Sequence, residues 1–310
     1  MLATAVVAVM LEFAINLTLL TIPALYADGF YYLANSHKEV YYICSVFNKL
    51  QLLRKYLHYY YTAYNGKGHG MHSPFVYDFI IHVLNDKTAY ADYARVETVR
   101  RRLLSDHTMI QVKDLGAGSS KNNHPGRRVN DIAKHAAKPR KFGQLLYRMV
   151  RYYHPGQVIE LGTSLGITTQ YLALASPTTT IVTMEGADEV ADIALEEIRK
   201  AGLINVQLLR GNFDELLPAQ LAKKQTPGLV FIDGNHRKEP TIRYFEQLAA
   251  AAGNDTILVF DDIHWSTEME EAWEYIRQHP STRCCIDLFF IGIVLFRQEF
   301  REKQDFVIRF

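Results

Sequence analysis

The chain has 310 residues, of which 48% are hydrophobic and 12% aromatic, and its formal net charge is +1 at pH 7. This composition excludes an intrinsically disordered chain, and the near-zero charge gives no overall attraction to nucleic acid or another polyanion. The three cysteines provide no disulfide framework, which fits a reducing compartment and predicts a cytoplasmic protein.

Residues 1–42 form an apolar N-terminal extension. Residues 1–27 are mostly apolar, but Glu12 and Asn16 interrupt them and no lysine or arginine precedes them. The segment therefore fits neither a clean membrane span nor a secretory signal with a basic start. Four alternatives stay open: a membrane anchor, a signal peptide, a packed helix, or an extension from an upstream translation start.

Residues 43–140 are expected to form a helical cap over the substrate region. Helical patterns run over Cys44–Ala63, Phe75–Asn85 and Tyr90–Leu104. The glycine-rich loop 66–75 could be a lid or substrate-pocket segment that brings His69 or His72 close to a ligand. The alternative is a flexible connector whose histidines are solvated.

A glycine turn in Ile110–Ser119 competes for the role of ligand site. It contains Asp114, Gly116 and Gly118, but the segment that follows is polar and no second strand ending in an acid appears before residue 158. A helix dipole and a ribose acid would both be missing there, so we expect a loop on the substrate side instead.

Nine basic residues stand against the single acid Asp131 between positions 121 and 151. Such a run is a candidate surface for nucleic acid, but aromatic residues that could stack on bases are not interleaved with it. We therefore expect a solvated helix face. The nine residues are Lys121, Arg127, Arg128, Lys134, Lys138, Arg140, Lys141, Arg148 and Arg151.

The stretch Val158–Thr169 carries the strongest signal for ligand binding. A short apolar strand ends at Glu160-Leu-Gly162, and the turn continues through Ser164 and Gly166 into an apolar helix. Glycines permit a close approach of backbone to a ligand, and the N–H groups of the following helix point into the same crevice. A side chain at Gly162 is therefore expected to fill ligand space and block binding in a folded protein. The alternative is an ordinary tight strand-to-helix turn that binds no ligand.

Strands and helices then alternate to the end of the chain. Apolar strands are predicted at 180–185, 206–210, 229–233 and 257–262, with amphipathic helices between them. This pattern predicts a doubly wound, mostly parallel seven-stranded α/β sheet, preceded by the N-terminal helical region. Three strand-like segments without an intervening helix, beginning at Arg283, predict an antiparallel hairpin at the end, which a nicotinamide-binding fold would not have.

Acidic residues end four of the predicted strands, and the first of them is Glu160. Glu185 ends the second strand, where it is placed to accept hydrogen bonds from ribose hydroxyls. Asp233, Asp261 and Asp262 end the fourth and fifth strands and should meet at one edge of the sheet. They could hold a divalent cation, line a polar substrate pocket, or cap the following turns.

Residues 141–310 resemble a class I S-adenosylmethionine-dependent methyltransferase of the catechol O-methyltransferase-like group. The resemblance implies that Glu185 holds the cofactor's ribose and that Phe213 and Asp214 line its adenine. It also implies a group of residues around the methionine part: Glu160, Gly162, Ser164 and Gly166.

The same resemblance implies that Asp233, Asp261 and Asp262 bind Mg²⁺, with Asp233 also on the cofactor side. The chain departs from the group in two places, because Asp262 stands where an amide is usual and His236 stands where the group has a lysine base. His236 and His264 are therefore the candidate general bases.

The predicted activity is S-adenosylmethionine-dependent O-methylation of a small molecule. Two alternatives are a non-catalytic cofactor-binding or regulatory module, and a methyltransferase acting on nucleic acid or lipid through the basic run or residues 1–27. A homodimer and a membrane-associated location are left open.

Overall fold

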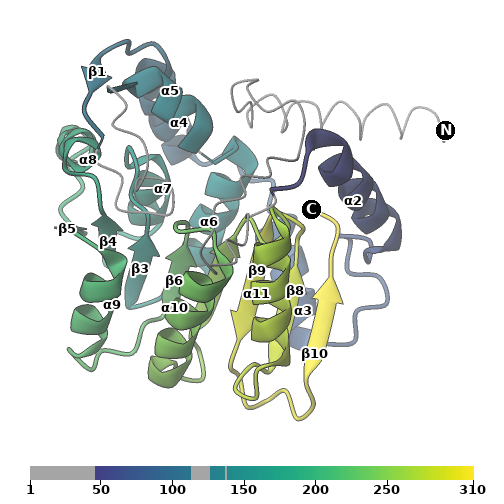
Figure 1. Ribbon diagram of the computed structural model, residues 1–310. Helices are drawn as coiled ribbons and strands as arrows, with labels where there is room; N and C mark the ends of the chain where they lie inside the picture. Colours follow the sequence, from purple (N-terminus) through teal and green to yellow (C-terminus); the bar gives the residue numbers. More distant parts are fainter. Residues whose placement is uncertain (1–45, 113–125, 137) are drawn as a thin grey trace, which may run out of the picture.

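The computed structural model describes residues 46–112, 126–136 and 138–310, and a mixed β-sheet lies at its centre with helices on both faces (Figure 1). The strands of this sheet are β3 (Gln157–Leu161), β4 (Thr180–Glu185), β5 (Val206–Arg210), β6 (Leu229–Ile232), β7 (Ile257–Asp261), β8 (Cys284–Asp287), β9 (Ile291–Leu295) and β10 (Gln304–Val307). A separate two-stranded ribbon joins β1 (Met109–Ile110) and β2 (Arg127–Arg128).

The helices of the N-terminal part are α2 (Lys49–Thr62), α3 (Pro74–Phe79), the π-helical turn η1 (Ile80–Leu84), α4 (Ala91–Leu104), α5 (Val129–Ala136) and α6 (Arg140–Tyr153). Those between and after the strands are α7 (Ile167–Ala175), α8 (Asp188–Lys200), α9 (Phe213–Leu221), α10 (Lys238–Ala251) and α11 (Thr267–Gln278). The helices predicted at 44–63, 75–85 and 90–104 are confirmed, the second as α3 continued by η1.

The predicted fold class is confirmed, with one strand more than expected. The strand order is β10-β8-β9-β7-β6-β3-β4-β5. Strand β9 runs antiparallel to both β7 and β8, which is the predicted hairpin, whereas β10 pairs with β8 in parallel. Because β7 and β8 already occupy both edges of β9, the last segment cannot pair with β9 and instead extends the sheet along the free edge of β8.

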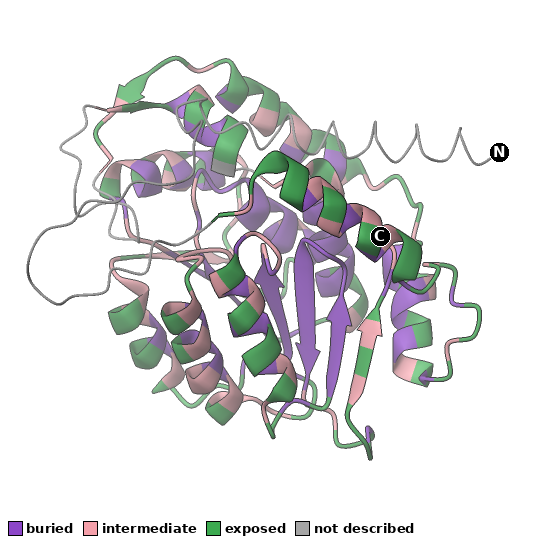
Figure 2. Ribbon diagram, turned by 45° about the vertical axis from the view of Figure 1, so that its right-hand side comes forward, coloured by how far each residue is buried: buried purple, intermediate pink, exposed green. Residues whose placement is uncertain are grey.

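The central strands are buried on both faces, as the sequence predicted for a parallel sheet between two helical layers (Figure 2). One face packs against α9, α10 and α11, and the other packs against α6, α7 and the N-terminal helices. Side chains alternate along β3, so that Ile159 and Leu161 face the α9–α11 layer while Val158 faces the other. Glu160, two residues after Val158, therefore points to the same side of the sheet as Val158.

The N-terminal helices share a hydrophobic core with the sheet. On α2, Tyr56 and Tyr59 pack against Phe289 after β8, with ring centroids 5.1 and 5.3 Å apart. The Tyr59 hydroxyl donates to the carbonyl of Ile308 beyond β10 at 2.5 Å. The division into a cap at 43–140 and a domain at 141–310 stays a prediction, since these contacts join the two parts closely.

Within the part of the chain that the structure describes, no helix is both long enough and apolar enough to cross a bilayer. The predicted anchor at 1–27 lies outside the described residues, as do Cys44 and most of the competing glycine turn. Cys284 and Cys285 are buried free thiols.

The basic run does not form one solvated helix face. Arg148 is buried on α6, where its Nε donates to the carbonyl of Val83 at 2.5 Å. Lys138, just before α6, is also withdrawn from solvent and lies among acidic side chains. The expectation of a solvated run is therefore wrong for these two residues, because α6 packs between α7 and η1 rather than on the surface.

Candidate active site

The glycine turn after β3 brings three strands together. The N–H groups of Gly162 and Thr163 both donate to the carbonyl of Met184 on β4, at 3.0 Å each. The N–H of Asp233, after β6, donates to the carbonyl of Leu161 at 2.9 Å. The turn therefore lies at the carboxyl ends of β3, β4 and β6, which is where doubly wound sheets bind their ligands.

Gly162 is required by the protein's own backbone as well as by a ligand. Its φ is +104°, and a Cβ built there would lie 2.0 Å from the carbonyl oxygen of Asp233. The structure argues against the expectation that a side chain at this position would leave the fold intact, because its Cβ would push β3 and β6 apart. Gly162 still lines the pocket described below.

Gly166 and Ser164 have different roles in the same turn. Gly166 is buried, with φ +76°, and an added Cβ would lie 3.5 Å from Ala194 of α8. Ser164 adopts φ +47°, a left-handed conformation that is uncommon for residues other than glycine, and lines the pocket. Ser164 is therefore the member of this pair that lines the pocket.

Glu160 lies behind the turn rather than in the pocket. It has no exposed surface, and its Oε2 accepts hydrogen bonds from Thr169 on α7 and Thr183 on β4, at 2.5 and 2.6 Å. Burial raises the pKa of Glu160 to about 8, against the opposing effect of these two hydroxyls. Because side chains alternate along β3, the carboxyl group points into the α7 layer, and its predicted contact with the methionine part stays a prediction.

Glu185 lies where the sequence predicted a ribose acceptor. Its Oε2 accepts from the N–H of Ser164 at 2.8 Å, and its Oε1 accepts from the N–H of Ala187 at 3.0 Å. The carboxylate is thus fixed by backbone groups of two turns while it lines the pocket.

An aromatic wall stands opposite these polar groups. Phe213, the first residue of α9, lines the pocket beside Tyr244, with the two rings 6.3 Å apart and nearly perpendicular. Asp214 is exposed and forms an ion pair with Arg243 at 2.7 Å. The structure therefore places Phe213 where a flat ring could lie and turns Asp214 away.

Together these residues enclose a cavity of about 280 Å³, hereafter the strand-end pocket. This volume is near the lower end of the range for small-molecule sites, roughly 300 to 1,000 Å³. The pocket is lined by His135, Lys138, Gly162, Ser164, Glu185, Gly186, Ala187, Gly211, Asn212, Phe213, Asp233, Gly234, Asn235, His236, Tyr244 and Asp262.

Lys138 lies among the three acids predicted to bind a metal. Its Nζ lies 3.3 Å from Asp262 Oδ2 and 3.8 Å from Asp233 Oδ1, and it forms a direct ion pair with Asp261 Oδ2. Burial alone would raise the pKa of Asp233, but Lys138 and then His236 outweigh that effect and hold this pKa below its usual value. The like charges that the sequence brings together are thus compensated by a side chain of the same chain.

The acids also have the spacing of a metal site. Asp233, His236 and Asp261 each offer one ligand atom, and these atoms lie within 4.8 Å of one another. The oxygen-rich donor set suits a hard cation such as Mg²⁺, but the ammonium group of Lys138 takes up the same carboxylates. Binding of Mg²⁺ by Asp233, Asp261 and Asp262 stays a prediction.

His236 lines the strand-end pocket beside Asp233. Its Nε2 lies 3.5 Å from Asp233 Oδ1. If Nε2 carries the proton that faces Asp233, Nδ1 is left free to accept a proton from an acceptor hydroxyl.

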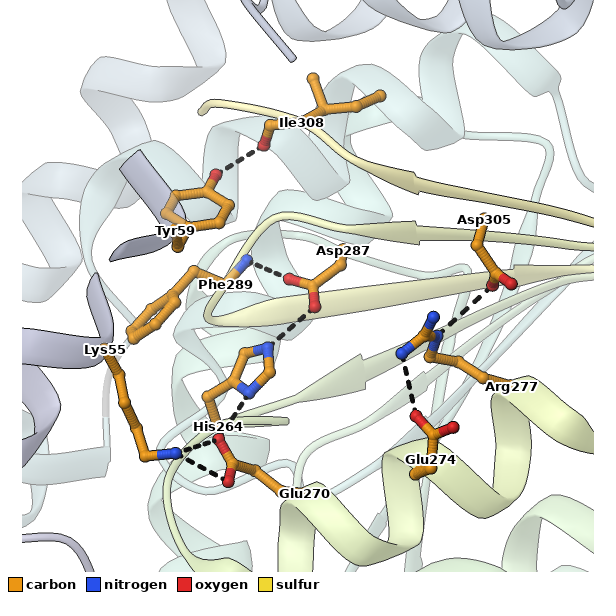
Figure 3. Close-up of polar contacts among 10 residues, drawn as sticks. All are labelled: Lys55, Tyr59, His264, Glu270, Glu274, Arg277, Asp287, Phe289, Asp305 and Ile308. Carbon is orange, nitrogen blue, oxygen red and sulfur yellow. Dashed lines mark hydrogen bonds and ion pairs between the residues drawn. The ribbon is translucent and has the colours of Figure 1, made fainter. Parts of the chain in front are cut away.

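His264 lies in a different environment. Its Nδ1–H donates to Glu270 Oε1 at 2.9 Å and its Nε2–H donates to Asp287 Oδ2 at 2.8 Å, while Lys55 of α2 donates to Glu270 (Figure 3). These hydrogen bonds outweigh burial and raise the pKa of His264 to about 9. The ring lines a separate cavity of about 610 Å³ together with Phe289. To act as the predicted base, it would first have to lose one of these two protons and the hydrogen bond that this proton makes.

The sequence missed several lining residues. Lys138 and His135 were hidden in the basic run, and burial together with Lys134 lowers the pKa of His135. Asn235 carries a stronger signal, because an asparagine after a glycine at a strand end favours a left-handed turn, and its φ is +54°. Ser266 caps the start of α11, where its side chain accepts from the N–H of Met269.

Comparisons with known proteins agree with this geometry. Residues 159–263 match a family model described as a methyltransferase domain. The chain is 33% identical over 113 residues to a transmembrane O-methyltransferase homolog of Rattus norvegicus, covering 36% of this chain and 44% of that protein. It is 28% identical over 124 residues to a catechol O-methyltransferase of Niastella koreensis, covering 39% of this chain and 55% of that protein. The chain thus matches about half the length of these curated relatives.

A solved structure shares the fold. The methyltransferase of Podospora anserina, solved with SAH bound, aligns with a TM-score of 0.51 at 12% identity, covering 73% of this chain and 97% of that one. The resemblance inferred from the turn after β3 and the acids at the strand ends is confirmed. Residues 159–263 thus match a methyltransferase domain, and the chain is similar over part of its length to O-methyltransferases.

Proposed function

We propose that this protein is an S-adenosylmethionine-dependent methyltransferase that methylates a hydroxyl oxygen of a small molecule. The observation that carries the proposal is the composition of the strand-end pocket. The Glu185 carboxylate, held by backbone N–H groups, and the Phe213 ring line the same cavity as the His236–Asp233 pair. The catechol and transmembrane O-methyltransferases to which the chain is similar support the choice of oxygen as acceptor.

The pocket fits the proposed cofactor in three respects. Two backbone N–H groups hold the Glu185 carboxylate in the pocket, at the end of β4, where it would accept from ribose hydroxyls. Phe213 and Tyr244 offer an apolar surface to a flat base, and Ser164 and Gly162 border the remaining part of the cavity.

When bound, S-adenosylmethionine supplies an activated methyl group, so the protein's task is to position the acceptor and remove its proton. His236 takes the acceptor's hydroxyl proton at Nδ1, and Asp233 stabilises the resulting imidazolium across 3.5 Å. Asp262 lies at the same edge of the pocket and borders the space for the acceptor.

Calorimetric titration with S-adenosylmethionine and with SAH tests the first part of the proposal. Glu185→Gln should weaken both ligands by about 10- to 100-fold, the value of a hydrogen bond to a charged group. Asp188→Asn, which removes an exposed carboxylate three residues further on, is the matched control and should bind normally. If wild-type protein binds neither ligand, the proposal fails.

A methyl-transfer screen with isotopically labelled cofactor tests the second part. Hydroxylated small molecules should accept the label, and His236→Ala should slow transfer by about 10²- to 10⁴-fold without changing cofactor affinity. Cofactor binding without transfer to any acceptor class would favour the non-catalytic module instead. Transfer only to nucleic acid or lipid would favour the other alternative.

A further inference from the structure

We propose that Lys138 is the built-in cation of the strand-end pocket, and that it takes the place of a divalent metal ion, so that the enzyme needs no added metal. Its catalytic consequence rests on the proposed methyltransferase function, whereas the exclusion of metal does not. Lys138 is a positioning residue in this scheme, because it acts on the carboxylates and not on the acceptor.

The geometry around Lys138 carries the inference. The ammonium nitrogen contacts Asp261 directly and lies 3.3 and 3.8 Å from Asp262 and Asp233. These acids end two neighbouring parallel strands, β6 and β7, so the lysine enters the same space that a metal bound to all of them would fill. An ion and the ammonium group cannot occupy that space together.

The charges are also complementary. One ammonium group lies within ion-pair distance of three carboxylates. Asp261 is only 1% exposed, and neither of its oxygens has a hydrogen bond from the residues that the structure describes, so its ion pair with Lys138 compensates its buried charge. The side chain of Lys138 is 12% exposed, which is unusual for lysine and agrees with a paired, enclosed charge.

Asp262 provides the third carboxylate around the ammonium group. Asp262 is held with φ +54° by its N–H bond to the carbonyl of Phe290 at 2.7 Å, which directs its side chain to the pocket.

Titration with Mn²⁺, followed by the loss of the free-ion signal in electron paramagnetic resonance, tests the exclusion of metal. Wild-type protein should show no saturable site at about 100 μM Mn²⁺, whereas Lys138→Met, which keeps the length of the side chain but removes its charge, should gain one site. Lys138→Met combined with Asp261→Asn should lose that site again, and Lys138→Arg should behave as wild type. Lys134→Met, which removes an exposed charge from the same basic run, is the matched control and should gain nothing.

Two outcomes of this titration would overturn the inference. Stoichiometric Mn²⁺ binding by wild-type protein would show that Lys138 does not exclude metal. Absence of binding by both wild type and a folded Lys138→Met would show that the acids are not a cation site that the lysine fills. Thermal melting and SAH binding establish that each variant is folded, and a failure of SAH binding in wild type would count against the proposed function alone.

A second measurement uses wild-type protein and needs no variant. Methyl transfer should be unchanged, within twofold, by EDTA and by added Mg²⁺. A loss of at least tenfold in EDTA that Mg²⁺ restores would overturn the inference while leaving the proposed activity intact.

Discussion

The glycine turn after β3 offers a sharp test of the structure, because two of its glycines have positive φ but very different surroundings. At Gly162 a Cβ would lie 2.0 Å from the Asp233 carbonyl oxygen, whereas at Gly166 it would lie 3.5 Å from Ala194, an ordinary contact. We therefore compare Gly162→Ala with Gly166→Ala. The two changes are chemically identical and four residues apart.

The expected costs follow from these distances. Both variants place an alanine in a left-handed conformation, which costs about 1 to 2 kcal/mol. Gly162→Ala must in addition move the end of β3 from the end of β6, and we expect a total loss of about 3 to 5 kcal/mol. At about 2 °C or more per kcal/mol, Gly162→Ala should lower the melting temperature by at least about 6 °C and Gly166→Ala by about 2 to 4 °C.

Denaturant titration and thermal melting measure these losses, with the slope of the denaturant curve as a check that both variants unfold in the same way. Gly166→Ala should also retain cofactor binding, since that glycine faces α8. Equal losses for the two variants would refute the reasoning from the Asp233 contact. A stable Gly162→Ala that fails to bind cofactor would restore the simpler view that this glycine only makes room for a ligand.

Three further predictions concern individual side chains. The folded-state pKa of Glu160 is raised to about 8, so the folded state holds an extra proton and stability should fall as pH rises from about 4.5 to 8; melting curves of Glu160→Gln should lack that fall. The raised pKa of His264, about 9, contributes stability that is complete below about pH 6.5 and lost as pH rises through 9; His264→Gln should be less stable than wild type at pH 6 and nearly equal to it at pH 10. Phe213→Ala should weaken cofactor binding in calorimetry by about tenfold or more, by analogy with the stacking of bases on aromatic rings, whereas Asp214→Asn should leave it unchanged because that carboxylate pairs with Arg243. A pH profile unchanged by either acid–base variant, or equal affinities for the last two, would count against the corresponding contact.

The sequence predicted the order of the helices and strands and the position of the site. Apolar strands alternating with amphipathic helices dictate a parallel sheet with two helical layers, because such strands can be buried only on both faces. The carboxyl ends of parallel strands share one edge, and so the sequence also indicated that Glu185 and Asp233 would lie in one pocket. Both line the strand-end pocket.

Tertiary structure decided what the strand pattern leaves open. The alternation along β3 turns Glu160 into the α7 layer, where two threonine hydroxyls hold it, although its position in the motif resembles that of a cofactor contact. His264 is two residues from an acid of the pocket, yet its ring is held between Glu270 and Asp287 in another cavity. The local sequence does not determine where the side chains of Glu160 and His264 point, because each orientation depends on which distant element packs against the strand end.

Lys138 shows the same limit most clearly. In the sequence it is one of nine basic residues in a run, and nothing nearby distinguishes it from its neighbours. Only the packing of α6 beside α7 brings the start of that helix to the acids that end β6 and β7, about a hundred residues later in the chain. The sequence by itself determined that negative charge would gather at this edge of the sheet, and the tertiary structure decided which cation meets it.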